Sequence, residues 1–262
     1  MLKNIYTPLS GAIAHERAIE TIANNLANLN TVGFKGDAVT FTLQNPEPYK
    51  NYKDPLPPAN YKVAFDDIRF LRGNDLNYAG IAGMKRDHSQ GPALQTHNPT
   101  DLMIEGKGHF QVNTMEGIRY TRAGNLSVGP DGALVTSQGD PILGEKGVIY
   151  VRAGAFEVNG SGEVYQDGVL KDRMKLYHFK DPDLVERASG NYILYDGPED
   201  GISQLENPVV RQGFLEGSNV NAIKNLTSMI MAHRSYEAYQ KNVSNLDSMM
   251  DKSSNTIGSL RV

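Results

Sequence analysis

Apolar residues recur at helical spacing near both ends of the chain, whereas the middle alternates short β-prone runs with turns. Between residues 2 and 30 the apolar positions match the a and d sites of a heptad: Leu2, Ile5, Leu9, Ala12, Ile19, Ala23 and Leu26. The pattern predicts a helix that stops near Gly33, where glycine can take the left-handed conformation without a side-chain clash. Gly11 and the alanines of this segment would let a partner helix approach closely.

The C-terminal segment has the same character and begins after Ser218 and Asn219, either of which could cap a helix. Apolar residues then follow three or four apart, except for one step of six from Ile230 to Tyr236, with no Pro or Gly between Val220 and Ile257: Ile223, Leu226, Ile230, Tyr236, Tyr239, Val243, Leu246 and Met250. Such a helix would be about 55 Å long, longer than the roughly 46 Å diameter of a compact sphere of this chain length. We therefore expect an elongated protein or a helix that belongs to an assembly.

Between these segments, turn signals such as Met115-Glu116-Gly117 and Pro130-Asp131-Gly132 separate short β-prone runs and predict antiparallel, sequence-local hairpins. Five prolines in residues 44–62 predict an extended connector, because proline disfavours both helix and central strand. The predicted fold is α+β, in which the terminal helices pair like a coiled coil into a discontinuous helical domain. The predicted boundaries are 1–35 plus 218–262 for the helices, 36–80 for the connector and 81–217 for the β-rich domain.

Composition narrows the chemistry that the chain can perform. Its 262 residues include no cysteine, which excludes disulfides, thiolate metal sites and cysteine nucleophiles. They also include no tryptophan, so an aromatic-lined sugar or base-stacking site is poorly supplied. The net charge of −4 gives no electrostatic footprint for nucleic acid. No apolar run has the length of a signal peptide or a membrane span, so ordinary rules would place the protein in the cytoplasm, without membrane insertion.

No catalytic constellation emerges from the sequence. The six histidines lack the spacing of metal ligands. His88 and His97 share a loop-rich stretch with Asp101, where a base–acid pair is conceivable. Asp66-Asp67 and the pair Asp181 and Asp183 fit turn or cap roles better than the role of paired catalytic carboxylates. The sequence GKGHF lacks the spacing of a phosphate loop. We therefore predict no enzyme, no cofactor and no metal.

Residues 23–35, ANNLANLNTVGFK, carry a specific resemblance. They are similar to the signature of the bacterial flagellar axial proteins, the family of rod and hook subunits, at Asn24, Asn25, Leu26, Ala27, Asn28, Thr31, Gly33, Phe34 and Lys35. The tail resembles the same family at Leu215, Glu216, Ser218, Asn219, Val220, Met229, Ile230, Arg234, Tyr236, Glu237 and Lys241. SQGPALQT (89–96), DLMIEGKGHFQV (101–112), YTRAGNL (120–126) and GDPILGEKGVI (139–149) match the family in the centre. The family often has Phe where this chain has His109.

The resemblance implies a structural subunit of the flagellar basal-body rod, of the proximal-rod type in preference to the distal-rod type. Such a subunit would polymerise through its terminal helices into a tube that transmits torque across the periplasm. It implies export through the flagellar type III apparatus without a cleaved signal peptide, which replaces the cytoplasmic expectation. The implied partners are copies of itself, proximal and distal rod proteins, that export apparatus and the periplasmic ring around the rod. The motif residues and the apolar helix positions named above, apart from Tyr239 and Val243, would form the subunit interface.

Two features of the sequence, its clustered asparagines and a row of charged residues, allow two interpretations each. The asparagines at 24, 25, 28 and 30 disfavour helix by about 2–3 kcal/mol together, which fits either a frayed last turn or amides that cross-link packed helices. Arg234, Glu237 and Lys241 share one helical face and form either a solvated ion-pair row or an interface that selects partner and register. A competing class is a periplasmic cell-wall enzyme whose helices serve only to dimerise.

Overall fold

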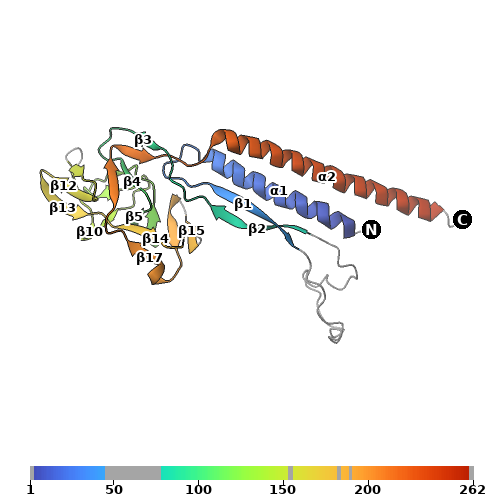
Figure 1. The fold of residues 1–262 in the computed structure, drawn as a ribbon, viewed down its shortest axis with the longest axis horizontal. Helices are drawn as coiled ribbons and strands as arrows, with labels where there is room; N and C mark the ends of the chain where they lie inside the picture. Colours follow the sequence, from blue (N-terminus) through green and yellow to red (C-terminus); the bar gives the residue numbers. More distant parts are fainter. Residues whose placement is uncertain (1–2, 45–77, 153–155, 182–183, 189–190, 260–262) are drawn as a thin grey trace, which may run out of the picture. The chain divides into compact units, whose positions relative to one another are not determined.

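The computed structural model describes residues 3–44, 78–152, 156–181, 184–188 and 191–259. The fold is α+β, with one helix near each end of the chain and an antiparallel β-rich part between them in sequence (Figure 1). The chain forms two compact units. Unit 1 comprises Met1–Ala23, Ala38–Met84 and Leu226–Val262, and unit 2 comprises Asn24–Asp37 and Lys85–Asn225.

The first helix, α1, spans Lys3–Ala27 and ends before the predicted stop near Gly33. Its end is capped by asparagine, because Nδ2 of Asn28 donates to the carbonyl of Asn24 at 2.9 Å. Thr31 Oγ1 then donates to Asn28 Oδ1 at 3.1 Å, within the turn that follows. Gly33 does adopt the left-handed conformation, with φ of 68°, in the loop beyond that turn. The predicted helix and the predicted glycine conformation are confirmed, but the helix end was placed too late.

The second helix, α2, spans Ala222–Ser259, and its 38 residues give a length of about 57 Å. Its N-cap is Asn221, whose Oδ1 accepts a hydrogen bond from the Lys224 amide at 2.9 Å. The expectation that Ser218 or Asn219 would cap the helix was therefore wrong. Asn219 is engaged elsewhere, because its Oδ1 accepts from the Gly36 amide at 2.8 Å.

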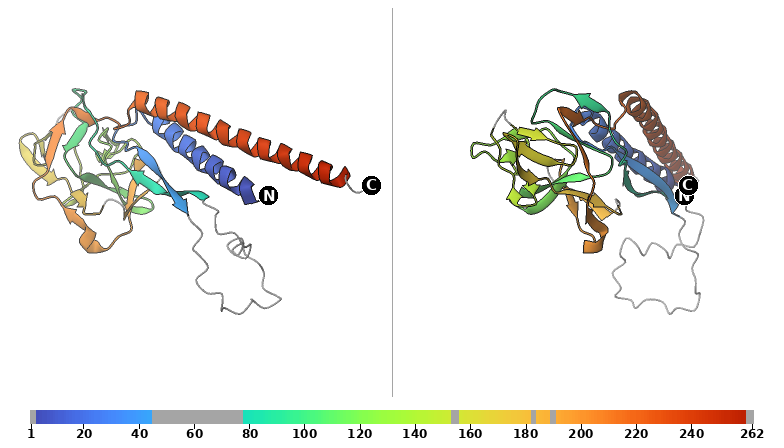
Figure 2. Two further views of the ribbon diagram at one scale, coloured as in Figure 1. Left: turned by 45° about the vertical axis from the view of Figure 1, so that its right-hand side comes forward. Right: turned by 60° about the vertical axis from the view of Figure 1, so that its left-hand side comes forward.

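In unit 1, α1 lies alongside α2 and alongside the pair of strands β1 (Asp37–Gln44) and β2 (Tyr78–Arg86), as the views of Figures 1 and 2 agree. The His15 ring of α1 lies between the rings of Phe41 and Tyr239, at centroid distances of 5.2 and 5.6 Å. Gly11 permits this approach, since a Cβ there would lie 2.6 Å from Cε1 of Tyr239. Of the predicted connector, residues 45–77 lie outside the described residues, and β1 and β2 form its described ends.

Unit 2 is built from short antiparallel strands. Its largest sheet has the order β15 (Val185–Arg187), β16 (Ile193–Tyr195), β6 (Gly117–Thr121), β5 (His109–Thr114), β14 (Leu176–Phe179) and β17 (Ile202–Gln204), with the short 3-10 helix η4 (Glu199–Gly201) before β17. A three-stranded sheet has the order β11 (Phe156–Val158), β12 (Glu163–Gln166) and β13 (Val169–Arg173). Four two-stranded ladders pair β7 (Ser127–Val128) with β8 (Leu134–Val135), β9 (Leu143–Gly144) with β10 (Gly147–Val148), β3 (Ala93–Gln95) with β19 (Phe214–Glu216), and β4 (Leu102–Glu105) with β18 (Val209–Gln212).

The predicted hairpins are confirmed where local turns join neighbouring strands, as between β5 and β6 or between β7 and β8. The expectation that only local hairpins close this part was wrong. The last two strands of unit 2, β18 and β19, pair with two early strands, β4 and β3. Backbone hydrogen bonds therefore join segments of unit 2 that lie far apart in the sequence. The core between these strands is apolar and includes Leu102, Ile104, Phe110, Val112, Leu134, Ile142, Ile149, Val164, Met174 and Leu176.

Candidate functional site

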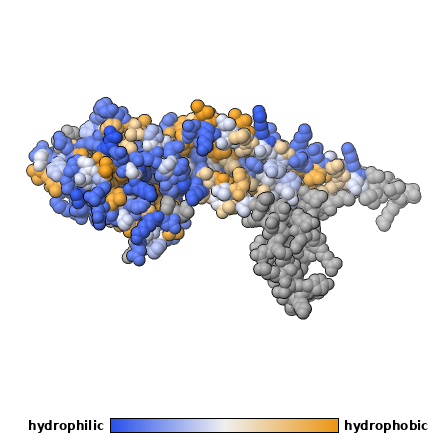
Figure 3. Space-filling view, in the orientation of Figure 1, coloured by the Kyte–Doolittle hydropathy of each residue, from blue (hydrophilic) through white to orange (hydrophobic). Residues whose placement is uncertain are grey.

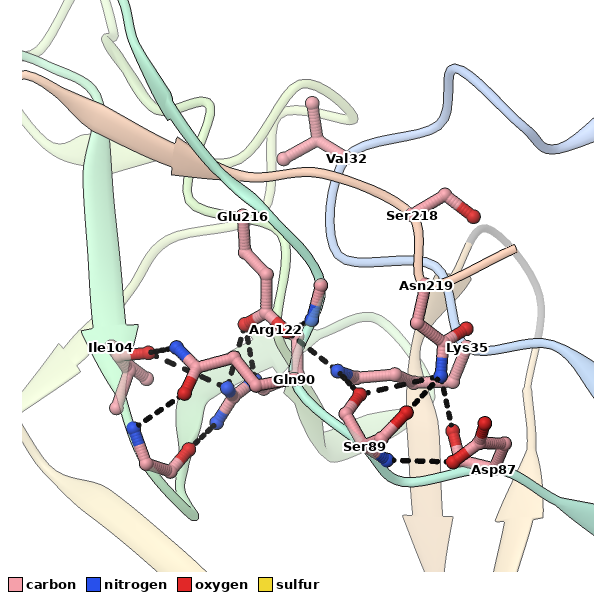
Figure 4. A network of polar contacts seen from close by, with 12 residues as sticks. Val32, Lys35, Asp87, Ser89, Gln90, Ile104, Arg122, Glu216, Ser218 and Asn219 are labelled. Carbon is pink, nitrogen blue, oxygen red and sulfur yellow. Dashed lines mark hydrogen bonds and ion pairs between the residues drawn. The ribbon is translucent and has the colours of Figure 1, made fainter. Parts of the chain in front are cut away.

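A buried carboxylate, Glu216, lies at the point where the chain leaves β19 toward α2. Only 1% of Glu216 is exposed. Its Oε1 accepts a hydrogen bond from Nζ of Lys35 at 2.5 Å and another from the Gly91 amide at 3.0 Å. Its Oε2 accepts from Nε of Arg122 at 2.8 Å, and Nη2 of the same guanidinium lies 2.6 Å away (Figure 4). We call Lys35, Arg122 and Glu216 the charge cluster.

The charge cluster holds two cations and one anion, and backbone carbonyls accept further hydrogen bonds from both cations. Lys35 Nζ donates to the Ser89 carbonyl at 2.5 Å, and Arg122 Nη1 donates to the carbonyls of Gly106 and Gly108 at 2.8 and 2.5 Å. Burial lowers the pKa of Lys35, and the adjacent Glu216 carboxylate acts in the opposite direction. Because buried charges are tolerated only when they are paired and hydrogen-bonded, the three side chains depend on one another.

Gly33 brings the chain close to Glu216 and Arg122, two residues before Lys35. The Gly33 amide donates to the carbonyl of Glu216 at 2.8 Å. A Cβ on Gly33 would lie 2.6 Å from the carbonyl carbon of Arg122, which is main chain and cannot rotate away. Glycine is therefore required at position 33 for two reasons: the backbone there has a left-handed φ, and it packs closely against the segment that carries Arg122.

A second polar group surrounds Asp37, at the start of β1. The Asn25 side chain bonds the Asp37 backbone twice, donating to its carbonyl at 2.7 Å and accepting from its amide at 3.0 Å. The Asp37 carboxylate pairs with Nε of Arg86 at 3.1 Å and with Nη1 of Arg187 at 3.5 Å. The Arg187 guanidinium also lies 4.6 Å from the centroid of the Phe34 ring. We call Asn25, Asp37, Arg86 and Arg187 the Asp37 cluster.

Both helices also carry an apolar face that points into solvent. On α1, Tyr6, Leu9 and Ile13 are 46, 41 and 51% exposed, and on α2, Ile223, Leu226 and Ile230 are 78, 51 and 57% exposed. Each set has the spacing i, i+3, i+7, which places its members on one side of a helix. Figure 3 shows apolar side chains gathered on the surface of the helical part of the molecule. We call these two sets the outward faces.

Comparisons with known proteins identify the family. The models "Flagella basal body rod protein", "Flagellar hook protein FlgE/F/G D1 domain" and "Flagellar basal body rod FlgEFG protein C-terminal" match residues 5–35, 103–149 and 211–256. The chain is 31% identical to the flagellar basal-body rod protein FlgF of Caulobacter vibrioides, over 92% of both chains. The chain belongs to the flagellar basal-body rod protein family. It is thus a structural rod protein, and its family is not an enzyme family.

Relatives of two kinds match this rod protein over nearly their whole length. It is 27% identical to the rod protein FlgF of Mesorhizobium japonicum, over 99% of both chains. It is 28% identical to the rod protein FlgG of Bacillus subtilis, over 96% of this chain and 98% of the relative. The likeness to both kinds confirms the predicted family and the basal-body rod as the location.

The structure sorts the predicted interface residues of this rod protein by burial. Leu2 lies outside the described residues. Buried within the subunit are Ala12, Asn25, Gly33, Phe34, Lys35, Glu216 and Ser218. Half-buried are Ile5, Ile19, Ala23, Leu26, Asn28, Thr31, Leu215, Asn219, Val220, Met229, Tyr236, Leu246 and Met250. Exposed are Leu9, Asn24, Ala27, Ile223, Leu226, Ile230, Arg234, Glu237 and Lys241.

The asparagines of the rod signature act within this subunit. Asn25 binds β1, Asn28 caps α1, and Oδ1 of Asn24 accepts from Arg187 at 3.2 Å. Within the described part of the chain, these amides therefore fasten the end of α1. On the exposed side of α2, Nδ1 of His233 lies 3.3 Å from Oε1 of Glu237, next to Arg234 in the predicted charge row.

Sequence reasoning missed several of the residues that build these sites. Arg122 belongs to the segment YTRAGNL, which carried the resemblance, but no periodicity assigned it a role. Asp37 and Arg187 belong to no quoted motif, and only the fold brings them together. Among the described residues, no cluster of His, Asp and Glu has the composition of a metal site. Neither helix has a stretch both long and apolar enough to cross a membrane, within the residues described.

Proposed function

We propose that this rod protein is a proximal-rod type subunit that polymerises with copies of itself and with neighbouring rod proteins through the outward faces of α1 and α2. The observation that carries this proposal is the presence of six large apolar side chains on two helices, all at least 41% exposed in the single subunit. Burying apolar surface contributes about 25 cal/mol per Å². Contact with neighbouring subunits would supply that burial, since identical contacts that do not close generate a helical polymer.

Within the subunit we propose coiled-coil-like pairing of the two helices, supported by the contact between His15 and Tyr239 beside Gly11. Residues 1–35 and 218–262 would form the inner helical layer of the rod and residues 81–217 the outer layer. Residues 36–80 would connect these layers and carry torque between neighbours. The charge row Arg234, Glu237 and Lys241, which continues the outward side of α2, would select the axial register of neighbouring subunits.

The family membership supports further proposals about the export and assembly of this protein. We propose export through the flagellar type III apparatus without cleavage of a signal peptide, followed by assembly in the periplasmic portion of the basal body. The export apparatus would then be a transient partner, and the periplasmic ring around the rod would be a lateral one. The rod would transmit torque because each subunit is bonded to several neighbours at once.

The substitution Ile230→Asp tests the interface proposal. An aspartate on an outward face would be buried without a partner in the polymer but would stay solvated in the monomer. We expect loss of polymerisation of the purified full-length chain, measured by sedimentation and electron microscopy, with an unchanged circular dichroism spectrum. The matched control is Met115→Asp, because Met115 is fully exposed in the turn between β5 and β6 and should tolerate the same change. Normal polymerisation of Ile230→Asp would contradict the proposed interface.

A further inference from the structure

The hairpin between β11 and β12 in unit 2 contains the single Asn-Gly sequence of the chain, Asn159-Gly160. Asparagine is a thermolabile residue, and glycine after it leaves the next amide nitrogen without a side chain that hinders attack. In deamidation the Gly160 nitrogen attacks Cγ of Asn159, and the side-chain nitrogen leaves as ammonia with the proton of the Gly160 amide. Water then opens the resulting succinimide to aspartate or isoaspartate. Asn159 is therefore a candidate site of spontaneous modification.

Both polar atoms of the Asn159 side chain are bonded within this turn. Its Oδ1 accepts hydrogen bonds from the amides of Ser161 at 3.0 Å and of Glu163 at 2.9 Å. Its Nδ2 donates to Oε2 of Glu163 at 2.7 Å. Asparagine often satisfies the amides of a turn in this way. For Cγ to face the Gly160 nitrogen along the line of attack, the side-chain amide must rotate, and rotation breaks these bonds.

The backbone on both sides of the reacting atoms is also held. The Asn159 amide donates to the carbonyl of Glu163 at 3.0 Å, and the Asn159 carbonyl accepts from the Gly162 amide at 3.0 Å. The Gly160 carbonyl accepts from the amide of Val210, in β18, at 2.9 Å. Closing the succinimide ring changes the backbone torsion that joins Asn159 to Gly160. The reaction therefore requires the end of the hairpin to open locally.

Two further side chains hold the Glu163 carboxylate in place. The Tyr165 hydroxyl donates to Oε2 of Glu163 at 2.9 Å, and Nη2 of Arg173 donates to Oε1 at 3.3 Å. Hydrogen bonds from Asn159 and Tyr165 lower the pKa of Glu163, so it accepts these bonds as a carboxylate. Deamidation would replace the donor Nδ2 by a carboxylate oxygen. Two carboxylates would then face each other, so the product does not fit this turn.

We propose that Asn159 is a deamidation site that the folded hairpin keeps unmodified, and that Glu163 sets the rate by holding Nδ2 of Asn159. In the unfolded chain these hydrogen bonds are absent, and Asn159 reacts as it would in a free peptide. The modification therefore accumulates in chains that stay unfolded. All the residues involved lie in unit 2, and the proposal does not depend on polymerisation.

A comparison of the folded and the unfolded full-length chain tests the protection. Both samples are incubated at the same pH and temperature, one in buffer and one in urea. Deamidation is followed by mass spectrometry of the peptide that contains Asn159, and isoaspartate is measured by enzymatic methylation. We expect deamidation to be at least about tenfold slower in buffer than in urea, because the hairpin must open first. Equal rates in the two samples would overturn the proposal.

Substitutions of Glu163 in the folded chain test its part in the protection. We expect at least about threefold faster deamidation in Glu163→Ala, which loses the acceptor of Nδ2, and a nearly unchanged rate in Glu163→Gln, whose amide oxygen can still accept. The matched control is Glu157→Ala, because Glu157 is exposed on the neighbouring strand β11 and should leave the rate unchanged.

Tyr165→Phe keeps the carboxylate but removes the hydroxyl that holds it, and it stays informative if Glu163→Ala fails to fold. We expect deamidation in this variant to be at least about twofold faster than in the unaltered chain. Unchanged rates in Tyr165→Phe and in folded Glu163→Ala would overturn the role of Glu163. An equal acceleration by Glu157→Ala would overturn it too, because loss of any glutamate from the hairpin would then have the same effect.

Discussion

The charge cluster and the outward faces differ in which side chains they bury: the charge cluster buries charged side chains, whereas the outward faces expose apolar ones. In the charge cluster the side chains are buried, and Lys35 and Arg122 donate to Glu216 or to backbone carbonyls. On the outward faces, apolar side chains such as Leu9 and Ile230 lie in solvent. Substitution in the first region should therefore affect the folding of one subunit. Substitution in the second should affect mainly the association of subunits.

The tail of the chain, which resembles the rod family at several places, contains both kinds of residue. In the tail, Glu216 is buried and paired, whereas Ile230 and Arg234 are exposed on α2. Membership of a family signature therefore does not decide whether a residue stabilises the subunit or joins it to a neighbour. Burial and hydrogen bonding decide it.

The largest effect on stability is expected for Glu216→Gln. The amide can accept hydrogen bonds but carries no charge, so Lys35 and Arg122 would remain as two buried cations. Breaking a buried ion pair from one side costs about 3–5 kcal/mol, which urea unfolding of the Ile230→Asp monomer would measure. The matched change Glu116→Gln removes a pair with Arg119 in which the carboxylate is exposed to solvent, and it should cost less than about 0.5 kcal/mol. Equal effects at the two positions would show that burial is not the deciding factor.

The next largest effect is expected for Gly33→Ala. A left-handed φ costs a non-glycine residue about 1–2 kcal/mol, and the new Cβ would also meet the main chain at Arg122. Gly139 is the matched control, since it too has a positive φ, of 91°, but its Cβ would meet no atom within 4 Å. We expect thermal or urea unfolding to show a clearly larger loss for Gly33→Ala than for Gly139→Ala. A similar loss at both sites would mean that the contact with the Arg122 segment contributes little.

Much of the fold follows from local pattern, whereas the charge cluster does not. The two helices, the left-handed Gly33 and the hairpins could be predicted because each depends on a few neighbouring residues. The pairing of Lys35 with Glu216 spans 181 residues, and no local pattern encodes it. Resemblance to the rod family did single out both residues, but it could not show that they are buried within one subunit.

The outward face of α1 was only partly predicted, for a reason that lies in its amphipathic pattern. The heptad assignment included Leu9 but left out Tyr6 and Ile13, and it assumed one apolar stripe. The helix instead has a buried side of small residues, Ala14 and Ala18, and an exposed side of large ones. Periodicity alone favours the large residues as the inner side. Close approach between elements favours small ones, and here this second effect determines the packing.

A pH-dependent effect of intermediate size is expected at His109, in β5. His109 is buried with its ring 4.9 Å from that of Phe179, and burial, together with the charge of Arg122, holds its pKa well below 6.5. The unfolded chain therefore binds a proton that the folded chain does not, and stability falls as the pH drops below about 6.5. The slope from this group can reach about 1.4 kcal/mol per pH unit.

His109→Phe should remove that slope. We expect the free energy of unfolding to fall less between pH 7 and pH 5 in the variant than in the unaltered chain, when both are measured by urea unfolding of the Ile230→Asp monomer. His178, whose pKa is also lowered by burial, is present in both chains, so its contribution cancels in the difference. The same slope with and without His109 would contradict the assignment of this proton uptake to the buried imidazole.

The smallest effect on stability is expected for Ile13→Ser on the outward face of α1. The Ile13 side chain is half exposed in the subunit, so replacing it should change the free energy of unfolding by about 0.5 kcal/mol or less. Polymerisation should nevertheless weaken strongly, because the interface would lose the apolar contacts that isoleucine supplies. Ala18→Ser, on the buried side of the same helix, should do the reverse by destabilising the subunit first. Sedimentation and urea unfolding of both variants would separate the two sides of α1. If Ile13→Ser lowered stability as much as Ala18→Ser, the face would belong to the subunit's own packing and not to the rod interface.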